Sequence, residues 1–257
     1  FIIARIIGGI AIGGASVLSP VYISEISPAA YRGRLGSVFQ LAIVIGILLA
    51  FASDLALLHT GVKNWRYMFL AGGIPAFAFF AMLFFVPSSP RWLVKAGRIN
   101  EAADVLNKLK ISDAAILINE IKESLTSEFG EKKEKLFKGK NLHFVLIGIA
   151  VGAFSQFTGI NIVMYYSADI FRSLGFSTDS AIWLTVIIGL TNLVSTIVGM
   201  LLIDRVGRKK LLLAGSLLMS IFLGLFGILT LNEYKGLGLL FLLIGFAFSF
   251  ASSTGIT

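Results

Sequence analysis

The stretch Phe144–Ala168, FVLIGIAVGAFSQFTGINIVMYYSA, contains no charged residue. A transmembrane helix needs about 20 predominantly apolar residues, so this stretch is long enough to cross a bilayer. It also carries two amides and two tyrosines within about three helical turns, at Gln156, Asn161, Tyr165 and Tyr166. Amide groups are costly in hydrocarbon unless they meet a partner. We therefore expect a polar partner for this segment inside the membrane.

Six further stretches share this absence of charge. Cutting the sequence at its charged residues leaves them at Ile6–Ser24, Leu35–Ser53, Tyr67–Pro90, Ser180–Ile203, Leu211–Asn232 and Gly236–Thr257. Only 14% of the residues are charged and 56% are hydrophobic, with a mean hydropathy of +0.89. A soluble globular domain carries about 25% charged residues. The sequence therefore predicts an all-α, polytopic membrane helical bundle and disfavours the alternative of a soluble helical core.

The basic residues gather on one side of the predicted spans. The chain has a formal net charge of +8. When loops are assigned to alternate sides, 17 basic residues fall on one side, in segments 32–34, 91–140 and 205–210, and four fall on the other. This asymmetry is typical of the positive-inside rule, so we interpret the side with 17 basic residues as cytoplasmic. Nucleic acid is therefore not an expected partner.

The residue inventory argues against catalysis and metal binding. The chain has no cysteine and only two histidines, His59 and His143, both at the ends of predicted spans. The spans show no nucleophile with a base and no set of metal ligands, and the sequence has no Walker-type GK[ST] motif. We therefore expect no enzyme activity, no metal and no cofactor. Because the chain begins on FIIAR and closes mid-span on SSTGIT, both ends are expected to be cut.

Three parts follow along the chain. Residues 1–90 hold three predicted spans, residues 91–143 form a polar cytoplasmic linker, and residues 144–257 hold four predicted spans, the last of them truncated. Apolar residues recur at helical spacing in the linker, with Ser112 as a candidate N-cap. The basic run 130–140 is interpreted as a hinge or a lipid-surface patch. Two membrane blocks joined in this way are typical of secondary transporters.

Two cytoplasmic loops carry acids and bases close together. In YISEISPAAYRGRLGS, residues 22–37, Glu25 lies seven residues before Arg32, and Arg34 follows after a glycine. In IDRVGRKK, residues 203–210, an acid precedes four bases. Such charges can pair with another segment and form a gate. Positive-inside topology and helix-end charges explain the same pattern, so spacing alone leaves both interpretations open.

Four more motifs stand beside these loops: RIIGGIAIGG, QLAIVIG, VPSSPRWLV and SQFTGINIVMYYS. Taken together in their order along the chain, the motifs resemble the sugar porter family of the major facilitator superfamily. The resemblance implies twelve membrane helices in two pseudo-symmetric halves joined by cytoplasmic helices, of which this chain holds the fourth to most of the tenth. It also implies inner-gate ion pairs, which we predict at Glu25, Arg32, Arg34, Arg91, Asp204, Arg205 and Arg208.

The resemblance also assigns the polar residues of the spans. Four amides match the sugar-hydroxyl ligands of the family: Gln40, Gln156, Asn161 and Asn192. Tyr165 and Tyr166 match an aromatic pair that helps close the outer side. An amide both donates and accepts hydrogen bonds, as sugar hydroxyls require, and aromatic rings cover the apolar face of a sugar. Gly159 would allow a broken helix that turns two of these amides into one cavity. Each amide alone could instead form an interhelical hydrogen bond worth about 0.6 kcal/mol.

Three positions depart from the family pattern. Ser155 stands where many members have a second glutamine, and Ile47 stands where one bacterial member has glutamine. These losses leave the preferred sugar open. Ser88 replaces a usual glutamate, which weakens one predicted inner-gate ion pair.

We predict a multi-pass protein of the cell membrane that transports a monosaccharide, either a hexose or a pentose, by alternating access and in symport with protons. Arg5 lies inside a predicted span and matches an arginine that, in proton-coupled members, lies near an acidic residue of the first helix. The expected partners are the monosaccharide, the proton and membrane lipid. A facilitative uniporter, a polyol or inositol transporter, and a transport-inactive sugar sensor are the alternatives.

Overall fold

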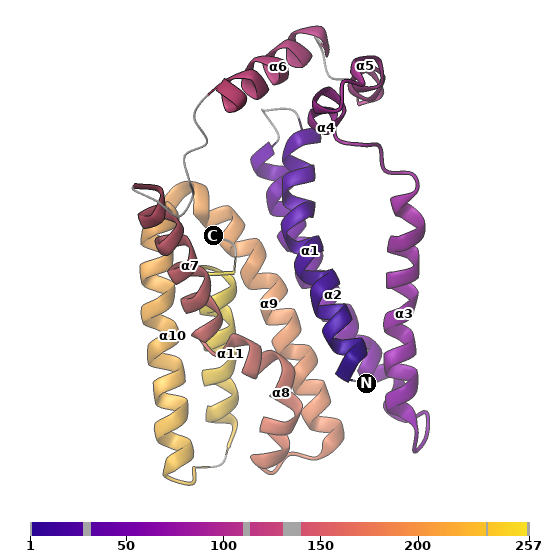
Figure 1. Cartoon of the computed structure of the whole chain (residues 1–257). Coiled ribbons are helices and arrows are strands. Elements are labelled where there is room, and N and C mark those ends of the chain that lie inside the picture. Colours follow the sequence, from indigo (N-terminus) through magenta and orange to yellow (C-terminus); the bar gives the residue numbers. More distant parts are fainter. Residues whose placement is uncertain (1, 28–31, 110–113, 131–139, 235, 256–257) are drawn as a thin grey trace. The chain divides into compact units, whose positions relative to one another are not determined.

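The computed structural model describes residues 2–27, 32–109, 114–130, 140–234 and 236–255, and every regular element in these ranges is a helix. The helices are α1 (Ile2–Ile26), α2 (Arg32–Leu57), α3 (Asn64–Leu83), α4 (Pro90–Lys95), α5 (Ile99–Lys108), α6 (Ala114–Gly130), α7 (Lys140–Phe157), α8 (Ile160–Ser173), α9 (Thr178–Val206), α10 (Arg208–Leu231) and α11 (Leu237–Ala251) (Figure 1). They fall into two compact units, Phe1–Phe39 with Phe80–Val145 and Gln40–Phe79 with Leu146–Thr257. The all-α fold predicted from the sequence is confirmed.

Most of these helices have the length and composition of membrane spans. Within the described ranges, six segments are long and apolar enough to cross a bilayer: Ile2–Ile26, Leu35–Leu57, Asn64–Leu83, Asn141–Ser173, Thr178–Ile203 and Arg208–Leu231. The seventh predicted stretch, 236–257, is helical only over the 15 residues of α11. After Ala251 the backbone tightens into turns, because the amides of Ser253 and Gly255 both donate to the Phe250 carbonyl.

One of the six spans is broken in its middle. α7 ends at Phe157 and α8 begins at Ile160, and between them Gly159 adopts a φ of +86°. Glycine enters this left-handed region without the steric cost that a Cβ atom imposes. The backbone amides of Ile162 and Val163 then donate to the Gly159 carbonyl at 3.1 and 3.2 Å, which starts the new helix. The break that the sequence predicted at Gly159 is confirmed.

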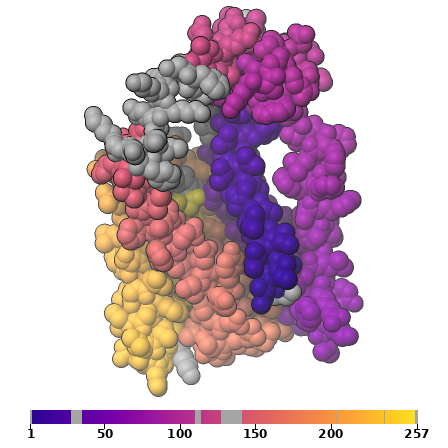
Figure 2. Space-filling view, viewed as in Figure 1, coloured from indigo at the N-terminus to yellow at the C-terminus, as the bar shows by residue number. Residues whose placement is uncertain are grey.

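The second unit packs around α11, which lies against α8, α9 and α10. Leu239, Phe246 and Ala247 of α11 are fully buried, together with Phe171 of α8 and Ile188 of α9. α7 contributes little to this core, since most of its apolar side chains are exposed. Figure 2 shows atoms of this segment on the visible face of the molecule. The core therefore fixes α8 and α9 firmly against α11. These two helices carry most of the predicted polar site.

In the first unit, α4, α5 and α6 form a cluster with a core of its own. Its buried residues are Leu93, Val94, Ala102, Leu106, Ile118 and Leu125. The linker is helical here, as the spacing of its apolar residues predicts. Pro90 opens α4, and the amide of Trp92 donates to the Ser89 hydroxyl at 3.3 Å, an N-cap bond. The Ser112 cap and residues 131–139 of the basic run lie outside the described residues.

A surface ion pair supports the start of α5. The Arg98 guanidinium donates to both carboxylate oxygens of Glu101, at 2.6 and 2.5 Å. These hydrogen bonds, together with the positive charge, lower the pKa of the Glu101 carboxyl below its ordinary value. Arg98 also lies over the ring of Trp92 at 5.7 Å, so the pair ties α5 back to α4.

Candidate functional site

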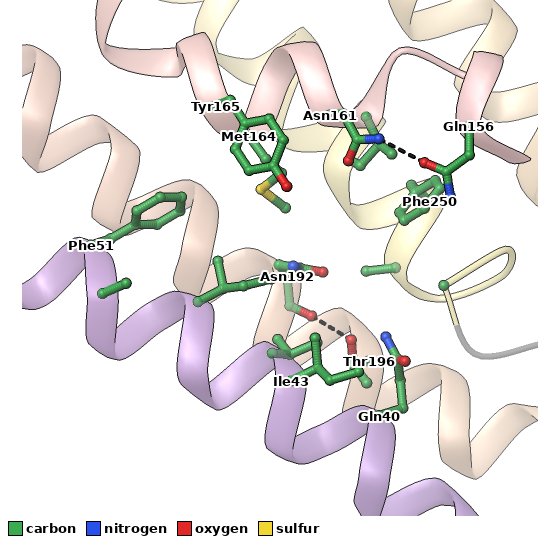
Figure 3. A pocket seen from close by; sticks show the side chains of 16 residues that line it. Gln40, Ile43, Phe51, Gln156, Asn161, Met164, Tyr165, Asn192, Thr196 and Phe250 are labelled. Atoms are coloured by element: carbon green, nitrogen blue, oxygen red, sulfur yellow. Dashed lines mark hydrogen bonds between the residues drawn. The ribbon is translucent and has the colours of Figure 1, made fainter. Parts of the chain in front are cut away.

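A pocket of about 430 Å³ opens within the second unit. Its walls come from α2, from both sides of the α7–α8 break, from α9 and from the end of α11 (Figure 3). The lining residues include five of the six predicted sugar-site residues, namely Gln40, Gln156, Asn161, Tyr165 and Asn192. These five predicted residues, up to 152 positions apart in the sequence, thus meet around one cavity.

Two of these amides bind each other across the break in the span. The Asn161 side-chain nitrogen donates to the Gln156 side-chain oxygen at 2.7 Å. Gln156 belongs to the last turn of α7 and Asn161 to the first turn of α8, so the bond bridges the left-handed Gly159. The remaining groups, the nitrogen of Gln156 with its two N–H donors and the oxygen of Asn161 as an acceptor, are available to a ligand.

The other two amides approach the cavity from α2 and α9. Asn192 is only 6% exposed, and within the described part of the chain neither its side chain nor that of Gln40 forms a hydrogen bond to the protein. The Thr196 hydroxyl donates to the Asn192 backbone carbonyl at 2.8 Å and leaves the Asn192 amide free. A buried amide of this kind needs a partner, because an unpaired polar group costs about 1–3 kcal/mol when it loses water. The pocket can hold that partner.

Apolar side chains complete the pocket, and these were not predicted from the sequence. They include Ile43, Phe51, Ile160, Met164 and Phe250. On α2 the lining residues recur every three or four positions after Gln40, as expected for one face of a helix. The same spacing leads from Asn161 to Met164 and Tyr165, and from Asn192 to Thr196. Most of these lining residues could therefore have been predicted as the residues three or four positions along the same helix from a predicted amide.

The two predicted tyrosines differ in position. Tyr165 lines the pocket, although 79% of its surface is exposed, so it lies at the mouth. Tyr166 is 58% exposed and is not among the lining residues. Neighbouring residues of an α-helix point about 100° apart, so both rings cannot face the same cavity.

Several hydroxyls of the membrane spans bond to a backbone carbonyl of the preceding helical turn. Ser16, Ser53 and Thr158 each donate to a carbonyl three or four residues earlier, at 2.8 Å. This back-bonding satisfies the hydroxyls without a ligand, as expected for serine and threonine in helices.

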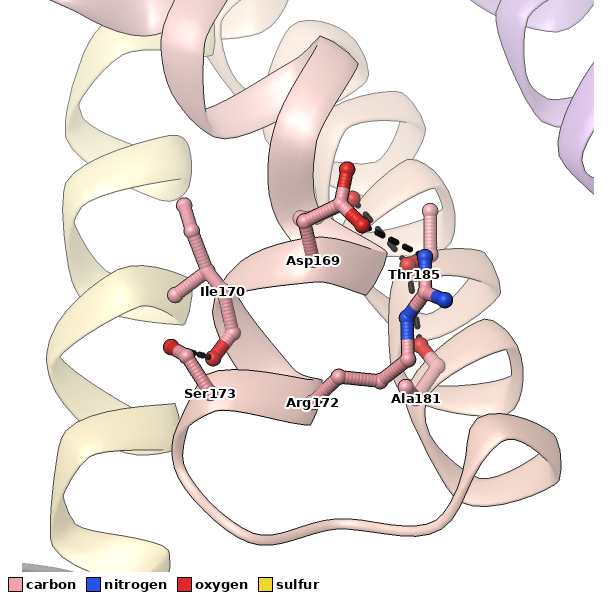
Figure 4. A network of polar contacts seen from close by, with 7 residues as sticks. Asp169, Ile170, Arg172, Ser173, Ala181 and Thr185 are labelled. Carbon is pink, nitrogen blue, oxygen red and sulfur yellow. Dashed lines mark hydrogen bonds and ion pairs between the residues drawn. The ribbon is translucent and has the colours of Figure 1, made fainter.

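A buried polar contact joins α8 to α9 beside the pocket (Figure 4). The Ser167 hydroxyl donates to that of Thr185 at 3.0 Å, and Thr185 donates in turn to the Ala181 carbonyl at 2.9 Å. Further along α8, Arg172 and Asp169 form an ion pair of 2.5 Å within the same helix. The contact between α8 and α9 thus holds the Asn161 and Asn192 helices in register.

A family model described as "Sugar (and other) transporter" matches residues 1–257, the whole chain. The chain belongs to this family. It is a family of transporters and not of enzymes, and its members cross the membrane several times, in agreement with the six span-length segments in the described part of this chain.

Curated relatives agree with this assignment. The chain is 38% identical over 262 residues to the D-xylose-proton symporter of Escherichia coli K12, an alignment that covers 99% of this chain and 53% of the relative. It is 38% identical to the arabinose-proton symporter of Bacillus subtilis, covering 99% and 56%, and 40% identical to the glucose transport protein of a Synechocystis strain, covering 89% and 52%. The chain thus spans about half the length of these relatives.

Solved structures show the same fold. The partially occluded inward open conformation of the xylose transporter XylE from E. coli matches 99% of this chain and 57% of its own, with a TM-score of 0.88 and 36% identity. The proton:xylose symporter XylE bound to 6-bromo-6-deoxy-D-glucose matches 99% of this chain and 55% of its own, with a TM-score of 0.83 and 38% identity. The chain therefore has the major facilitator fold.

None of the predicted inner-gate charges whose side chains the structure describes is among the residues that line the pocket. Glu25, at the end of α1, accepts a hydrogen bond from the Ser89 hydroxyl at 2.5 Å, and Arg91 follows on α4. Arg205 and Arg208 are exposed at the turn between α9 and α10 and form no ion pair within the described ranges. The side chains of Arg32, Arg34 and Asp204 lie outside the described residues. The gate therefore stays a prediction.

Arg5, the candidate for proton coupling, lies on α1 and is exposed. The resemblance to the family places its predicted acidic partner on the first helix of the family. The role of Arg5 also stays a prediction.

Proposed function

We propose that the full-length protein carries a monosaccharide across the membrane by alternating access, in symport with protons. The observation that carries this proposal is the convergence of Gln40, Gln156, Asn161 and Asn192 on one pocket. A sugar presents hydroxyls that each donate and accept, around a weakly apolar ring. Uncharged amides satisfy the first requirement, and apolar walls satisfy the second.

The size of the pocket supports a small substrate. A volume of about 430 Å³ lies at the lower end of the roughly 300–1,000 Å³ of small-molecule sites. Relatives of this chain are named for xylose, arabinose, glucose and galactose, so both pentoses and hexoses are candidate substrates. Ile47 lines the pocket, which favours an apolar contact where one bacterial member has an amide.

Coupling to protons rests on the relatives and on Arg5. Three kinds of relatives, those for xylose, arabinose and galactose, are named proton symporters. A guanidinium inside a span is costly unless it is paired or reaches water, which makes Arg5 a candidate for the coupling machinery.

The test is uptake of labelled xylose and glucose into proteoliposomes bearing the full-length protein, with and without an imposed proton gradient. Uphill uptake driven by the gradient supports symport, and saturable uptake that runs only downhill supports the uniporter alternative. If the protein binds a sugar but shows no uptake, the transport hypothesis is wrong and the alternative of a transport-inactive sugar sensor is supported.

Substitutions locate the site in the same assay. Gln156→Ala and Asn192→Ala each remove a hydrogen bond worth about 0.5–1.5 kcal/mol, so sugar affinity should fall about two- to tenfold. Asn232→Ala is the matched control, because this amide binds the Ile228 carbonyl at 2.8 Å at the end of α10 and does not line the pocket. Unchanged affinity in both pocket variants would refute the site.

A further inference from the structure

A histidine and an aspartate meet where α2 ends and α9 begins. His59 lies two residues beyond the end of α2, and Asp179 lies in the first turn of α9. The His59 Nε2 atom and the Asp179 Oδ2 atom are 3.9 Å apart. Both helices also line the pocket, through Gln40 and Phe51 on α2 and through Asn192 on α9.

The same two helices touch at a second level between this pair and the pocket. A Cβ atom on Gly189 of α9 would lie 2.8 Å from the Phe51 ring of α2, so this ring packs directly on the α9 backbone there. From Phe51 the chain runs eight residues to His59, and from Gly189 it runs ten residues back to Asp179. The two contacts therefore follow one antiparallel contact line from the pocket toward the side that the basic loops do not occupy.

The chemistry of the pair makes its strength depend on pH. Aspartate is ionised throughout the physiological range, whereas an ordinary imidazole gains its charge at about pH 6.5. The two carry opposite charges only after the histidine has taken up a proton. Their side chains are 77% and 63% exposed, so the bulk solution on that side can supply the proton directly.

Other charges near this end of the unit do not replace the pair. On neighbouring segments these are Asp54 on α2, Lys63 in the following loop, Arg66 on α3, and Asp169 and Arg172 on α8. Arg172 is bound to Asp169, and Arg66 lies over the Trp65 ring at 5.2 Å. Within the described residues none of the five forms an ion pair with His59 or Asp179.

A competing explanation is that Asp179 only stabilises its own helix. An acidic residue in the first turn interacts favourably with the helix dipole, and Ser177 caps the same turn by accepting from the Ser180 amide at 3.3 Å. That explanation gives His59 no role. It also gives the arrangement of α2 against α9 no dependence on pH.

We propose that His59 and Asp179 form a proton-dependent latch that holds α2 against α9 and keeps the non-cytoplasmic side of the pocket closed. The latch rests on the proposed function, because it closes an alternating-access pathway. A protonated His59 favours the closed arrangement and a neutral His59 releases it. Exposed ion pairs are weak, so the ratio of closed to open protein should change about two- to fivefold between pH 8 and pH 5.5.

The experiment measures distances in the full-length protein without sugar, by electron–electron double resonance between spin labels at Val62 and Leu231. Both side chains are highly exposed, at 100% and 86%. In the parent protein, lowering the pH from 8 to 5.5 should move population to the shorter distance. His59→Gln and Asp179→Asn should abolish that shift. His59→Arg carries a positive charge at both pH values, so it should hold the closed population at both.

A matched control separates a latch from a general charge effect. Asp169→Asn removes an ion pair of similar exposure that lies within one helix and joins no second element. It should leave the pH shift unchanged. A shift that persists in both His59→Gln and Asp179→Asn, or that disappears equally in Asp169→Asn, would overturn the latch.

Sugar binding to the same samples distinguishes this outcome from failure of the proposed function. His59→Gln should still bind sugar at pH 8, where the parent latch is released. Loss of the pH shift with sugar binding intact supports the latch. A protein that binds no sugar at all would refute the pocket, while its distance data would still decide whether the pair closes α2 against α9.

Discussion

The α4–α6 cluster and the α8–α11 bundle are both helical, but different side chains hold their helices together. In the α4–α6 cluster, large aliphatic residues such as Leu93 and Leu106 fill a core, each at most 2% exposed. In the α8–α11 bundle the closest approaches use small residues: a Cβ atom added to Gly215 would lie 2.3 Å from that of Ser253. The cluster packs side chain against side chain, whereas the bundle, besides burying large side chains such as Phe171 and Phe246, also brings backbones together at Gly215.

The predicted locations of the two regions, the α4–α6 cluster in water and the α8–α11 bundle in lipid, account for the difference. A cluster in water gains free energy when it removes aliphatic surface from water, so large apolar side chains stabilise it. Between helices in lipid this gain is absent, since the lipid tails are as apolar as leucine. Association there depends on close van der Waals contact, which small residues allow. The two regions should therefore fail under opposite substitutions.

The largest effect is expected when the α4–α6 core loses volume. Leu106 is fully buried, so Leu106→Ala should cost about 2–5 kcal/mol of the local opening free energy through lost burial and the cavity left behind. Hydrogen exchange of the α4–α6 amides in the full-length protein measures this opening. Ile116→Ala, at a residue 58% exposed on α6, is the control and should change exchange little. Equal protection in both variants would show that the cluster has no dry core.

The α8–α11 bundle should respond instead to added volume. In Gly215→Ala the new Cβ would lie 1.9 Å from the Ser253 hydroxyl oxygen and 3.1 Å from the Ser249 carbonyl, so α10 and α11 must move apart. Overpacking of this kind costs about 1–3 kcal/mol, which should lower the midpoint of thermal unfolding of the purified protein.

Two further variants test this contact in the same measurement. Gly224→Ala, in the same helix with nothing within 4 Å of the new atom, should leave the midpoint unchanged or raise it slightly. Adding Ser253→Gly to Gly215→Ala removes both of the nearest clashing atoms and should restore part of the loss. A midpoint for Gly215→Ala equal to that of Gly224→Ala would contradict close packing at this point.

The two regions also differ in how much their sequences reveal. The α4–α6 segment alternates polar and apolar residues at helical spacing, so both its helices and its buried face could be predicted. The membrane helices are apolar on every side. Their spans were predictable from length, but nothing in α9 or α11 says which apolar face meets a neighbour. Phe250 in the pocket wall was missed for this reason.

Polar and special residues break that uniformity and were therefore predictable. Gln40, Gln156, Asn161 and Asn192 are too costly to face lipid, so an inward direction could be expected for them. The break in the span could be predicted at Gly159 because glycine adopts backbone conformations that other residues avoid. The pair of His59 and Asp179 could not be found, because its two members are 120 residues apart and each lies in an ordinary loop or helix start.

The smallest of these effects concerns Gly159, a place where the bundle depends on backbone conformation. Gly159→Ala puts a side chain on a residue with a φ of +86°, which costs about 1–2 kcal/mol. Space is not the obstacle, since the nearest atom to the new Cβ would be 3.7 Å away. Relief of the strain turns α7 relative to α8 and pulls Gln156 from Asn161. Sugar affinity of the full-length protein should fall several-fold, as measured by titration calorimetry.

Gly152→Ala is the control for this variant. Gly152 lies within α7, has nothing within 4 Å of its added Cβ, and does not line the pocket. Alanine suits a helix interior better than glycine, so this variant should bind sugar as the parent does. If Gly159→Ala binds equally well, the left-handed break does not position the amides, and the site then depends on side-chain contacts alone, as the α4–α6 cluster does.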